Sequence, residues 1–233
     1  MGDPAPDFGV VLAAAGSGTR FGGKKQLMLL DGKSLLRHAL DTMISVPTVR
    51  QVVVVAPAED LEEIRGQLSD VISDVDIEVI AGGATRQDSV LNGLRALSAE
   101  CPYVLVHDAA RPLVTRDEIE RTVATIDRDG AAVLGYPSVD SVKQAENAFV
   151  GQNLERDRIW LVQTPQGGRT EVLRAAIESA RESGFVGTDE ASFFEREGIP
   201  VTLVLGSREN IKVTYPEDLA LAELFLARRR QDP

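Results

Sequence analysis

The stretch "VVLAAAGSGTRFGGKKQ", residues 10–26, decides the fold class of this chain. Its apolar start predicts a short buried strand, and a loop of glycines and basic side chains follows. Small side chains in such a loop let backbone N–H groups approach an anion closely. Two common phosphate motifs fail, because Phe21 replaces the third glycine of the dinucleotide fingerprint and Lys25 replaces the hydroxyl of the P-loop. The stretch therefore predicts either a different kind of phosphate loop or a basic surface turn.

Strand-like and helix-like segments alternate along the rest of the chain. A continuous β-branched run is typical of a strand buried on both faces, and it occurs in "RQVVVVAP". Further strands are predicted in "IEVIAGG", "YVLVHDAARP", "GAAVLGYP" and "VTLVLG". Helical spacing and capping residues predict helices at 34–46 with Ser34 as N-cap, at 59–68, at 116–128 with a capping box, and after Thr214 and Glu217. This alternation predicts an α/β fold with three layers and a mostly parallel sheet.

Residues 138–165 break the alternation and contain strand-like pieces around a turn at Glu146 and Asn147. We interpret this segment as a β-hairpin arm that projects from one α/β domain formed by residues 1–137 and 166–233. An isolated hairpin is only marginally stable in water. The arm therefore predicts a partner, and a homodimer is the expected assembly.

Composition and charge narrow the classes of function. The chain has 233 residues and a net charge of -11, which argues against a nucleic-acid partner because such partners need a basic face. A single cysteine, Cys101, fits a reducing cytoplasm. The sequence shows neither a signal-peptide pattern nor an apolar stretch of about 20 residues, so we expect no membrane partner.

Polar residues follow several predicted strands. Because the carboxyl ends of parallel strands share one edge of a sheet, the loops 15–25, 82–86, 108–111 and 207–212 are expected to converge. Asp108 directly follows a strand, where a carboxylate either holds Mg²⁺ or caps a turn. Ser89 either binds a base or caps the helix that we expect to begin there. His107 is more consistent with a structural role than with catalysis.

Several motifs together resemble one enzyme family. They are "AAAGSGTRF", "KKQ", "GGATRQDSV", "VHDAARP", "DSVK", "QTPQ", "TDEAS" and "NIKVTYPEDLALAE". From about residue 9 to about residue 228, the chain resembles the 2-C-methyl-D-erythritol 4-phosphate cytidylyltransferases. The resemblance implies a Rossmann-like nucleotidyltransferase sheet and the transfer of CMP from CTP to 2-C-methyl-D-erythritol 4-phosphate, with release of pyrophosphate.

The resemblance also implies roles for particular residues. The catalytic cations would be Arg20, Lys25 and Lys212. The nucleotide would be bound by Ala14, Ala15, Gly16, Gly18, Gly82, Gly83, Ser89 and Asp108, with Mg²⁺ at Asp108. The polyol phosphate would be bound by Arg111, Thr188 and Asp189, and by Ser141 and Arg156 from the arm of the other subunit. The chain departs from the family pattern at Lys24, where proline is common, and at Ser141, where threonine is usual.

Phosphate chemistry agrees with these roles. A phosphate ester is already an anionic nucleophile at neutral pH, so the reaction needs positioning and charge neutralisation more than a strong base. The alternatives are a ribitol-5-phosphate cytidylyltransferase, a sugar-1-phosphate nucleotidyltransferase and a non-catalytic nucleotide-binding regulator. The joint presence of Arg20, Lys25, Asp108 and Lys212 favours an enzyme, because binding alone needs fewer charges.

Overall fold

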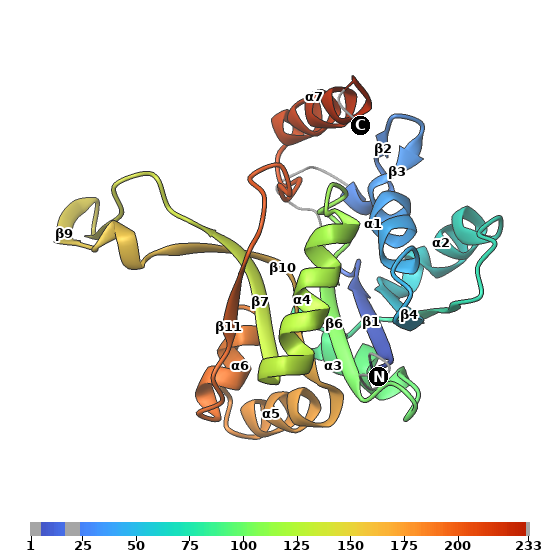
Figure 1. Ribbon diagram of the computed structural model, residues 1–233, viewed down its shortest axis with the longest axis horizontal. Helices are drawn as coiled ribbons and strands as arrows, with labels where there is room; N and C mark the ends of the chain where they lie inside the picture. Colours follow the sequence, from blue (N-terminus) through green and yellow to red (C-terminus); the bar gives the residue numbers. More distant parts are fainter. Residues whose placement is uncertain (1–5, 17–23, 232–233) are drawn as a thin grey trace.

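The structure is a computed structural model that describes residues 6–16 and 24–231. Figure 1 shows a central sheet with helices on both sides, a hairpin that extends far from it, and a C-terminal helix above it. The predicted site residues Gly18 and Arg20 lie outside the described residues.

The central sheet has seven strands in the order β11-β7-β10-β6-β1-β4-β5. All its pairs are parallel except those that β10 makes with β6 and β7. The predicted α/β fold with a mostly parallel sheet is therefore confirmed. The strands are β1 (Phe8–Ala13), β4 (Val49–Ala56), β5 (Asp76–Ala81), β6 (Tyr103–Asp108), β7 (Ala131–Pro137), β10 (Trp160–Arg169) and β11 (Thr202–Leu205).

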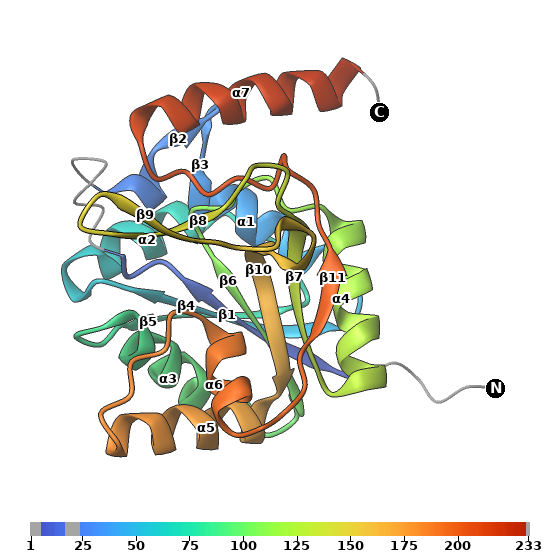
Figure 2. The same cartoon turned by 90° about the vertical axis from the view of Figure 1, so that its left-hand side faces the viewer.

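Alternating side chains of the central strands feed two separate hydrophobic cores. In β4, Val52 and Val54 face one core, and Val53 and Val55 face the other. Helices α1 (Leu35–Ile44), α2 (Leu61–Leu68) and α4 (Arg116–Asp129) cover the first core. Helices α3 (Arg86–Ala96), α5 (Thr170–Glu182) and α6 (Glu190–Arg196) cover the second, on the opposite face of the sheet in Figure 2. Burial on both faces explains why these strands read as continuous apolar runs.

Two smaller units flank the sheet. The strands β2 (Leu29–Leu30) and β3 (Lys33–Ser34) pack with α7 (Pro216–Gln231) around a third apolar cluster that includes Leu30, Leu35 and Ala222. The arm contains β8 (Lys143–Glu146) and β9 (Phe149–Asn153), joined through Asn147 and Ala148, which both have positive φ. Short 3₁₀ helices occupy Lys25–Leu27, Ala58–Asp60 and Arg156–Arg158. β10 begins at Trp160 and leads from the arm back into the central sheet (Figure 1).

Helix starts follow the predicted caps in two cases and differ in two. Ser34 Oγ accepts from the backbone N–H of Arg37, and Thr115 forms its capping box with Glu118. The box predicted from Thr214 and Glu217 is wrong, because Pro216 is the first helical residue and the carboxylate of Asp218 accepts from the N–H groups of Thr214 and Tyr215. A helix starting at Ser89 is also wrong: α3 starts three residues earlier, with Thr85 as its N-cap.

The strand order places a crevice above β1. The chain runs from β1 to β4 and β5 on one side, and then crosses to β6 on the other side of β1. Ligands of open α/β sheets bind at the carboxyl ends of strands where the order reverses in this way. Ala13 ends β1 directly beside Asp108, the last residue of β6, so the loops after these strands meet at that crevice.

His107, beside the crevice, is predicted to make stability depend on pH. The ring is fully buried, and burial lowers the pKa of His107 to about 4. In the unfolded chain its pKa is about 6.5, so between these values only the unfolded chain takes up the proton. Acidification from pH 6.5 to 4 should therefore reduce the free energy of unfolding by about 3 kcal/mol through this residue. Urea unfolding of the wild type and of His107→Gln across this range measures the effect, and equal slopes for both proteins would contradict it.

Candidate active site

A pocket of about 320 Å³ opens at the carboxyl edge of the sheet. Residues from five separate stretches of sequence line it, and they carry three cationic side chains, one carboxylate and many small groups. The lining includes the predicted Ala14, Ala15, Gly16, Lys25, Gly83, Ser89, Asp108 and Lys212, together with Thr85, Arg86 and Ala109. The side chains of residues 25 and 212, which are far apart in sequence, thus meet in one cavity.

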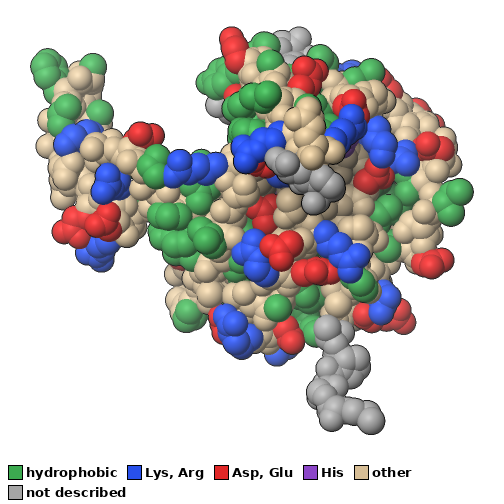
Figure 3. Space-filling view, turned by 45° about the horizontal axis from the view of Figure 1, so that its top comes forward, with side chains coloured by type: hydrophobic (Ala, Val, Ile, Leu, Met, Phe, Trp, Pro, Cys, Tyr) green, Lys and Arg blue, Asp and Glu red, His purple; other side chains and the backbone are tan. Residues whose placement is uncertain are grey.

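A second pocket of about 260 Å³ adjoins the first. The two pockets share Arg86, Asp108 and Lys212. The second pocket also contains the predicted Arg111, Thr188 and Asp189, with Val162, Gln163, Thr164 and Gln166 from β10. Figure 3 shows Lys and Arg side chains gathered on this face of a chain that is negative as a whole, with the arm standing to the left. The arrangement offers two adjacent anion sites with a charged wall between them.

The glycine turn after β5 forms one wall of the first pocket. Ser89 Oγ accepts from the backbone N–H of Gly83 at 3.1 Å and donates to the carbonyl of Thr85 at 2.8 Å. A Cβ at Gly82 would approach Ala15 Cβ and Ser89 Oγ at 2.8 Å, so only glycine fits between these groups. Ser89 therefore fastens the turn to the first turn of α3 rather than capping the helix.

Asp108 is the central charge of the site. Its Oδ2 accepts from Lys212 Nζ at 2.6 Å, and its Oδ1 lies 3.3 Å from Arg86 Nη2. Burial alone would raise the pKa of Asp108, but the charges of Arg86, Lys212 and Arg111 hold it well below its ordinary value. The backbone N–H of Asp108 donates to Thr164 Oγ1 at 3.1 Å, which fixes the strand end against β10. The carboxylate is thus ionised and held in place.

Lys25 lines the first pocket from a short 3₁₀ helix, and the residues before and after it in sequence both contact Asp60. Lys24 Nζ forms an ion pair with Asp60 at 2.6 Å, and Gln26 Nε2 lies 3.4 Å from the other oxygen of the same carboxylate. Hydrogen bonds to Asp60 and Glu63 raise the pKa of Lys24. Lys24 is therefore committed to α2 and its entry turn, and its neighbour Lys25 lines the pocket.

Lys212 depends on contacts between its loop and β10. Gln163 Nε2 donates to the carbonyls of Ser207 and Asn210 at 2.8 and 2.9 Å, and Asn210 Nδ2 donates to the carbonyl of Thr164 at 3.0 Å. These bonds fasten a loop without regular secondary structure to the sheet. The ammonium of Lys212 is consequently held at the shared wall of the two pockets.

Arg111 and Asp189 both line the second pocket. Arg111 Nη1 donates to the carbonyl of Asn210 at 2.8 Å, and its buried Nε has no hydrogen-bond partner among the described residues. Asp189 is the N-cap of α6, where its carboxylate accepts from the N–H of Ser192 at 3.0 Å and from Gln166 Nε2 at 3.2 Å. The pocket therefore combines a cation with a carboxylate that can accept hydroxyl donors.

Ser141 and Arg156 lie apart from these two pockets. They line a third pocket of about 340 Å³ on the arm, with Asn153, Leu154, Glu155 and Asp157. Within one chain, the structure therefore brings the predicted arm residues together with each other but not with Lys25 or Lys212.

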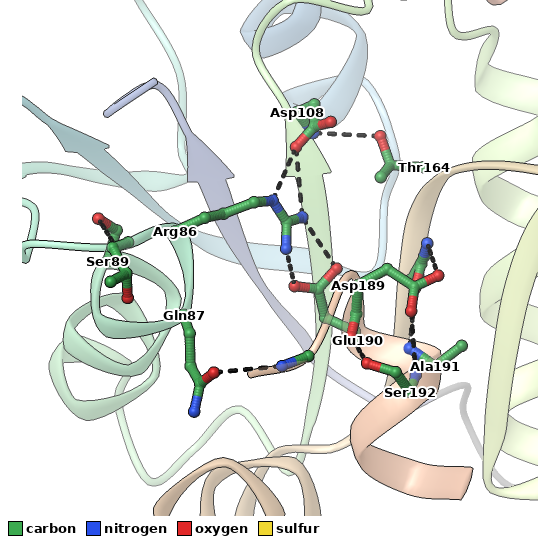
Figure 4. A network of polar contacts seen from close by, with 12 residues as sticks. Arg86, Gln87, Ser89, Asp108, Thr164, Asp189, Glu190, Ala191 and Ser192 are labelled. Carbon is green, nitrogen blue, oxygen red and sulfur yellow. Dashed lines mark hydrogen bonds and ion pairs between the residues drawn. The ribbon is translucent and has the colours of Figure 1, made fainter. Parts of the chain in front are cut away.

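Arg86 and Glu190 form the part of the site that the sequence reasoning missed. Figure 4 shows the guanidinium of Arg86 between the carboxylates of Glu190 and Asp108. Burial alone would lower the pKa of Arg86, but the charges of Glu190 and Asp108 raise it above its ordinary value. Arg86 follows the glycine pair in "GGATRQDSV" and Glu190 lies within "TDEAS", two motifs that carry the family resemblance, but no local pattern pairs residues 104 positions apart.

The carboxylate of Asp108 fits a magnesium ion that is bound mainly by phosphate oxygens. Mg²⁺ typically takes one or two carboxylates along with substrate phosphates and water. Among residues 6–16 and 24–231, no group of three or more His, Cys, Asp or Glu side chains forms a metal site. Asp108 is ionised, lines both pockets and has oxygen ligands of the preferred kind.

No helix in the described part of the chain, residues 6–16 and 24–231, has the length and apolarity needed to cross a membrane.

The mostly parallel sheet, the glycine turn at its carboxyl edge and the charged wall shared by the two pockets are the features expected of a nucleotidyltransferase. The family model described as 2-C-methyl-D-erythritol 4-phosphate cytidylyltransferase matches residues 8–228. The chain belongs to that family and is an enzyme of the cytidylyltransferase class.

Individual relatives agree with the family assignment. The proteins of this name from Solibacter usitatus and Haemophilus influenzae are both 40% identical to the chain, over 93% and 94% of it and 94% and 96% of their own lengths. The crystal structure of 4-diphosphocytidyl-2C-methyl-D-erythritol synthase from Anaerococcus prevotii superposes with a TM-score of 0.86, at 28% identity, over 96% of this chain and 97% of that chain. The cytidylyltransferase from Thermus thermophilus gives 0.76 at 34% identity, over 96% and 99%.

Gly83→Ala is predicted to weaken nucleotide binding. A Cβ at Gly83 would lie 2.3 Å from Asp88 Cβ and 3.0 Å from the backbone carbon of Asp88, so the turn must move. We expect CTP to bind about tenfold more weakly, which corresponds to about 1.4 kcal/mol in calorimetric titration. Gly66→Ala in α2 is the matched control, because its Cβ meets nothing within 4 Å. Unchanged CTP affinity in Gly83→Ala would contradict a nucleotide site at this turn.

Proposed function

We propose that the two adjoining pockets bind the two substrates of the family reaction, CTP and 2-C-methyl-D-erythritol 4-phosphate. The triphosphate and base would occupy the first pocket, against the glycine turns, and the polyol phosphate the second. The observation that carries this proposal is the shared wall of Arg86, Asp108 and Lys212. Transfer of a group from one pocket to the other would therefore take place beside these three side chains.

In this proposal the polyol phosphate is the nucleophile. One of its oxygens attacks the α-phosphorus of CTP, a new P–O bond forms, and the bond to the pyrophosphate leaving group breaks. Lys25 and Lys212, with Arg20 of the glycine loop, neutralise the charge on the oxygens around the reacting phosphorus. Such charge stabilisation in a preorganised site is worth a large part of the rate in phosphoryl transfer.

Asp108 would hold Mg²⁺, which when bound neutralises charge on the triphosphate. Its buried carboxylate is kept ionised by the neighbouring cations. The polar groups of the second pocket would orient the polyol phosphate: Arg111 through its guanidinium charge, and Asp189 and Thr188 through hydroxyl contacts.

We further propose that the enzyme is a homodimer in which the arm completes the partner's second pocket. Ser141 and Arg156 sit together on the arm, away from the other substrate-binding candidates of their own chain. The arm also exposes Phe149 and Val150 at 78% and 70%. A hairpin with exposed apolar residues is poorly stable alone, and contact with a second copy would cover them. The expected compartment is the cytoplasm, where CTP is available and the buried thiol of Cys101 stays reduced.

Pyrophosphate release tests the proposed substrates directly. The purified protein is incubated with Mg²⁺, one of the four nucleoside triphosphates, and either methylerythritol phosphate or ribitol 5-phosphate. We expect release with CTP and methylerythritol phosphate far above every other combination. Equal or faster release with ribitol 5-phosphate would reassign the second pocket.

Removing one cation from the first pocket is predicted to slow turnover without unfolding the chain. Lys25→Ala and Lys212→Ala should each reduce kcat on the order of 10²-fold, by analogy with the loss of one oxyanion donor. Lys33→Ala is the control, because Lys33 is half-exposed and pairs with Asp41 outside the pockets. Thermal unfolding should show similar Tm values for Lys25→Ala and Lys33→Ala, and a lower Tm but a still cooperative transition for Lys212→Ala, which removes one of the two ion pairs of Asp108. Normal turnover in Lys212→Ala would remove the charge-cluster mechanism.

The arm residue Arg156 is predicted to act on the polyol phosphate alone. Arg156→Ala should raise the KM for methylerythritol phosphate and leave CTP affinity nearly unchanged, whereas Arg158→Ala, also exposed on the arm, should change neither. At a methylerythritol phosphate concentration far below the KM of Arg156→Ala, both this variant and Lys212→Ala should be nearly inactive. Mixing the two should then restore about a quarter of wild-type activity, because only mixed dimers contain an intact site. No recovery after exchange of subunits would contradict a site shared between protomers.

A further inference from the structure

A fully buried carboxylate lies behind the shared wall of the two pockets. Glu190, the first residue of α6, is 0% exposed, and it accepts two hydrogen bonds from Arg86, from Nη1 at 2.7 Å and from Nη2 at 3.0 Å. Paired donors of this kind fix the plane of a guanidinium. Arg86 starts α3, so this ion pair joins the helix of the glycine turn to the helix that edges the second pocket (Figure 4).

The other side of the same guanidinium faces Asp108. Nε and Nη2 of Arg86 lie 3.4 and 3.3 Å from Asp108 Oδ1, and the opposite oxygen of Asp108 accepts from Lys212 Nζ at 2.6 Å. Four side chains therefore form a continuous row with alternating charge: Glu190, Arg86, Asp108 and Lys212. They come from α6, α3, the end of β6 and the loop before α7.

Arg86 differs from the other cations of the first pocket in its commitment to Glu190. If the guanidinium turned to follow a ligand phosphate, it would leave a fully buried carboxylate without a partner, which is strongly unfavourable. The guanidinium is therefore held in place, and what it offers the site is a fixed support for Asp108.

We propose that Arg86 is a positioning residue, through which buried Glu190 sets the carboxylate of Asp108 and thereby the ammonium of Lys212 at the wall between the two pockets. This inference deepens the proposed function and rests on it where turnover is measured. Its consequence is that the geometry of the wall depends on a carboxylate that touches neither substrate.

The test separates positioning from stability by removing one charge and then both. Arg86→Gln alone leaves the fully buried carboxylate of Glu190 without its cation and should lower Tm by several degrees, whereas Glu190→Gln leaves part-exposed Arg86 paired with Asp108 and should lower Tm less. Arg86→Gln with Glu190→Gln leaves two amides that can hydrogen-bond, so Tm should return toward the wild-type value. We expect kcat of this double variant to stay lower on the order of 10²-fold, as for a misplaced catalytic group, while its KM for CTP changes much less.

Arg86→Lys keeps a positive charge beside Glu190 but lacks the second N–H group that the guanidinium directs toward Asp108. It should keep most of the thermal stability and still show the loss of kcat, which preserves the test if the double variant does not fold. The matched control is Arg95→Gln with Glu178→Gln. These two residues form an exposed ion pair at 2.8 Å between α3 and α5, outside the pockets. This pair should leave kcat unchanged.

A second readout does not depend on the proposed substrates. Labelling with acetic anhydride, followed by peptide mass spectrometry, reports how firmly the ammonium of Lys212 is held. We expect Lys212 to be acetylated several-fold faster in the stable double variant than in the wild type. The labelling rate of Lys33 serves as the internal reference. Wild-type kcat and wild-type labelling in that variant would overturn the positioning role. Absence of turnover in the wild type with methylerythritol phosphate would instead count against the proposed function, and the labelling result would still decide the inference.

Discussion

The site depends on the ion pairs that the buried carboxylate of Asp108 forms with Arg86 and Lys212, two cations from distant segments of the chain. Placing a carboxylate at a buried strand end costs desolvation free energy, and the ion pairs with Arg86 and Lys212 offset that cost. The balance works in both directions, because each cation is also held by the carboxylate it neutralises. A chain with a net charge of -11 can therefore keep a cluster of cations at one edge of its sheet.

The sheet is what brings these charges together. Asp108 ends β6 beside the end of β1, and the reversal of strand order at β1 leaves the crevice into which α3 and the loop before α7 deliver their side chains. Lys212 has no regular element of its own, so its position depends on side-chain hydrogen bonds from Gln163 to its loop. The site thus combines strand ends, which the fold places rigidly, with a loop that β10 has to hold.

Local patterns in the sequence predicted the parts of this arrangement that are local. Continuous valine runs predicted strands buried on both faces, and the capping box at Thr115 predicted the start of α4, because each depends on residues a few positions apart. The pairing of Arg86 with Glu190 depends on packing between α3 and α6, and no spacing encodes it. The glycines after "QTPQ" had no interpretation from sequence either. A Cβ at Gly167 would lie 1.9 Å from the carbonyl oxygen of Val104, so the close antiparallel approach of β10 to β6 explains that glycine.

The chain's two histidines show what kind of catalysis this site supports. Nε2 of His38 lies 2.7 Å from the carbonyl oxygen of Leu30, and His107 is buried between the carbonyl of Arg111 and the hydroxyl of Thr164. Burial keeps His107 neutral and away from solvent, so it holds strand ends together rather than moving protons. The charged side chains that do reach the pockets belong to Lys, Arg and Asp residues. A phosphate nucleophile is ionised before it binds, and a site built of fixed charges suits it because the reaction requires alignment and neutralisation of oxygen rather than removal of a proton.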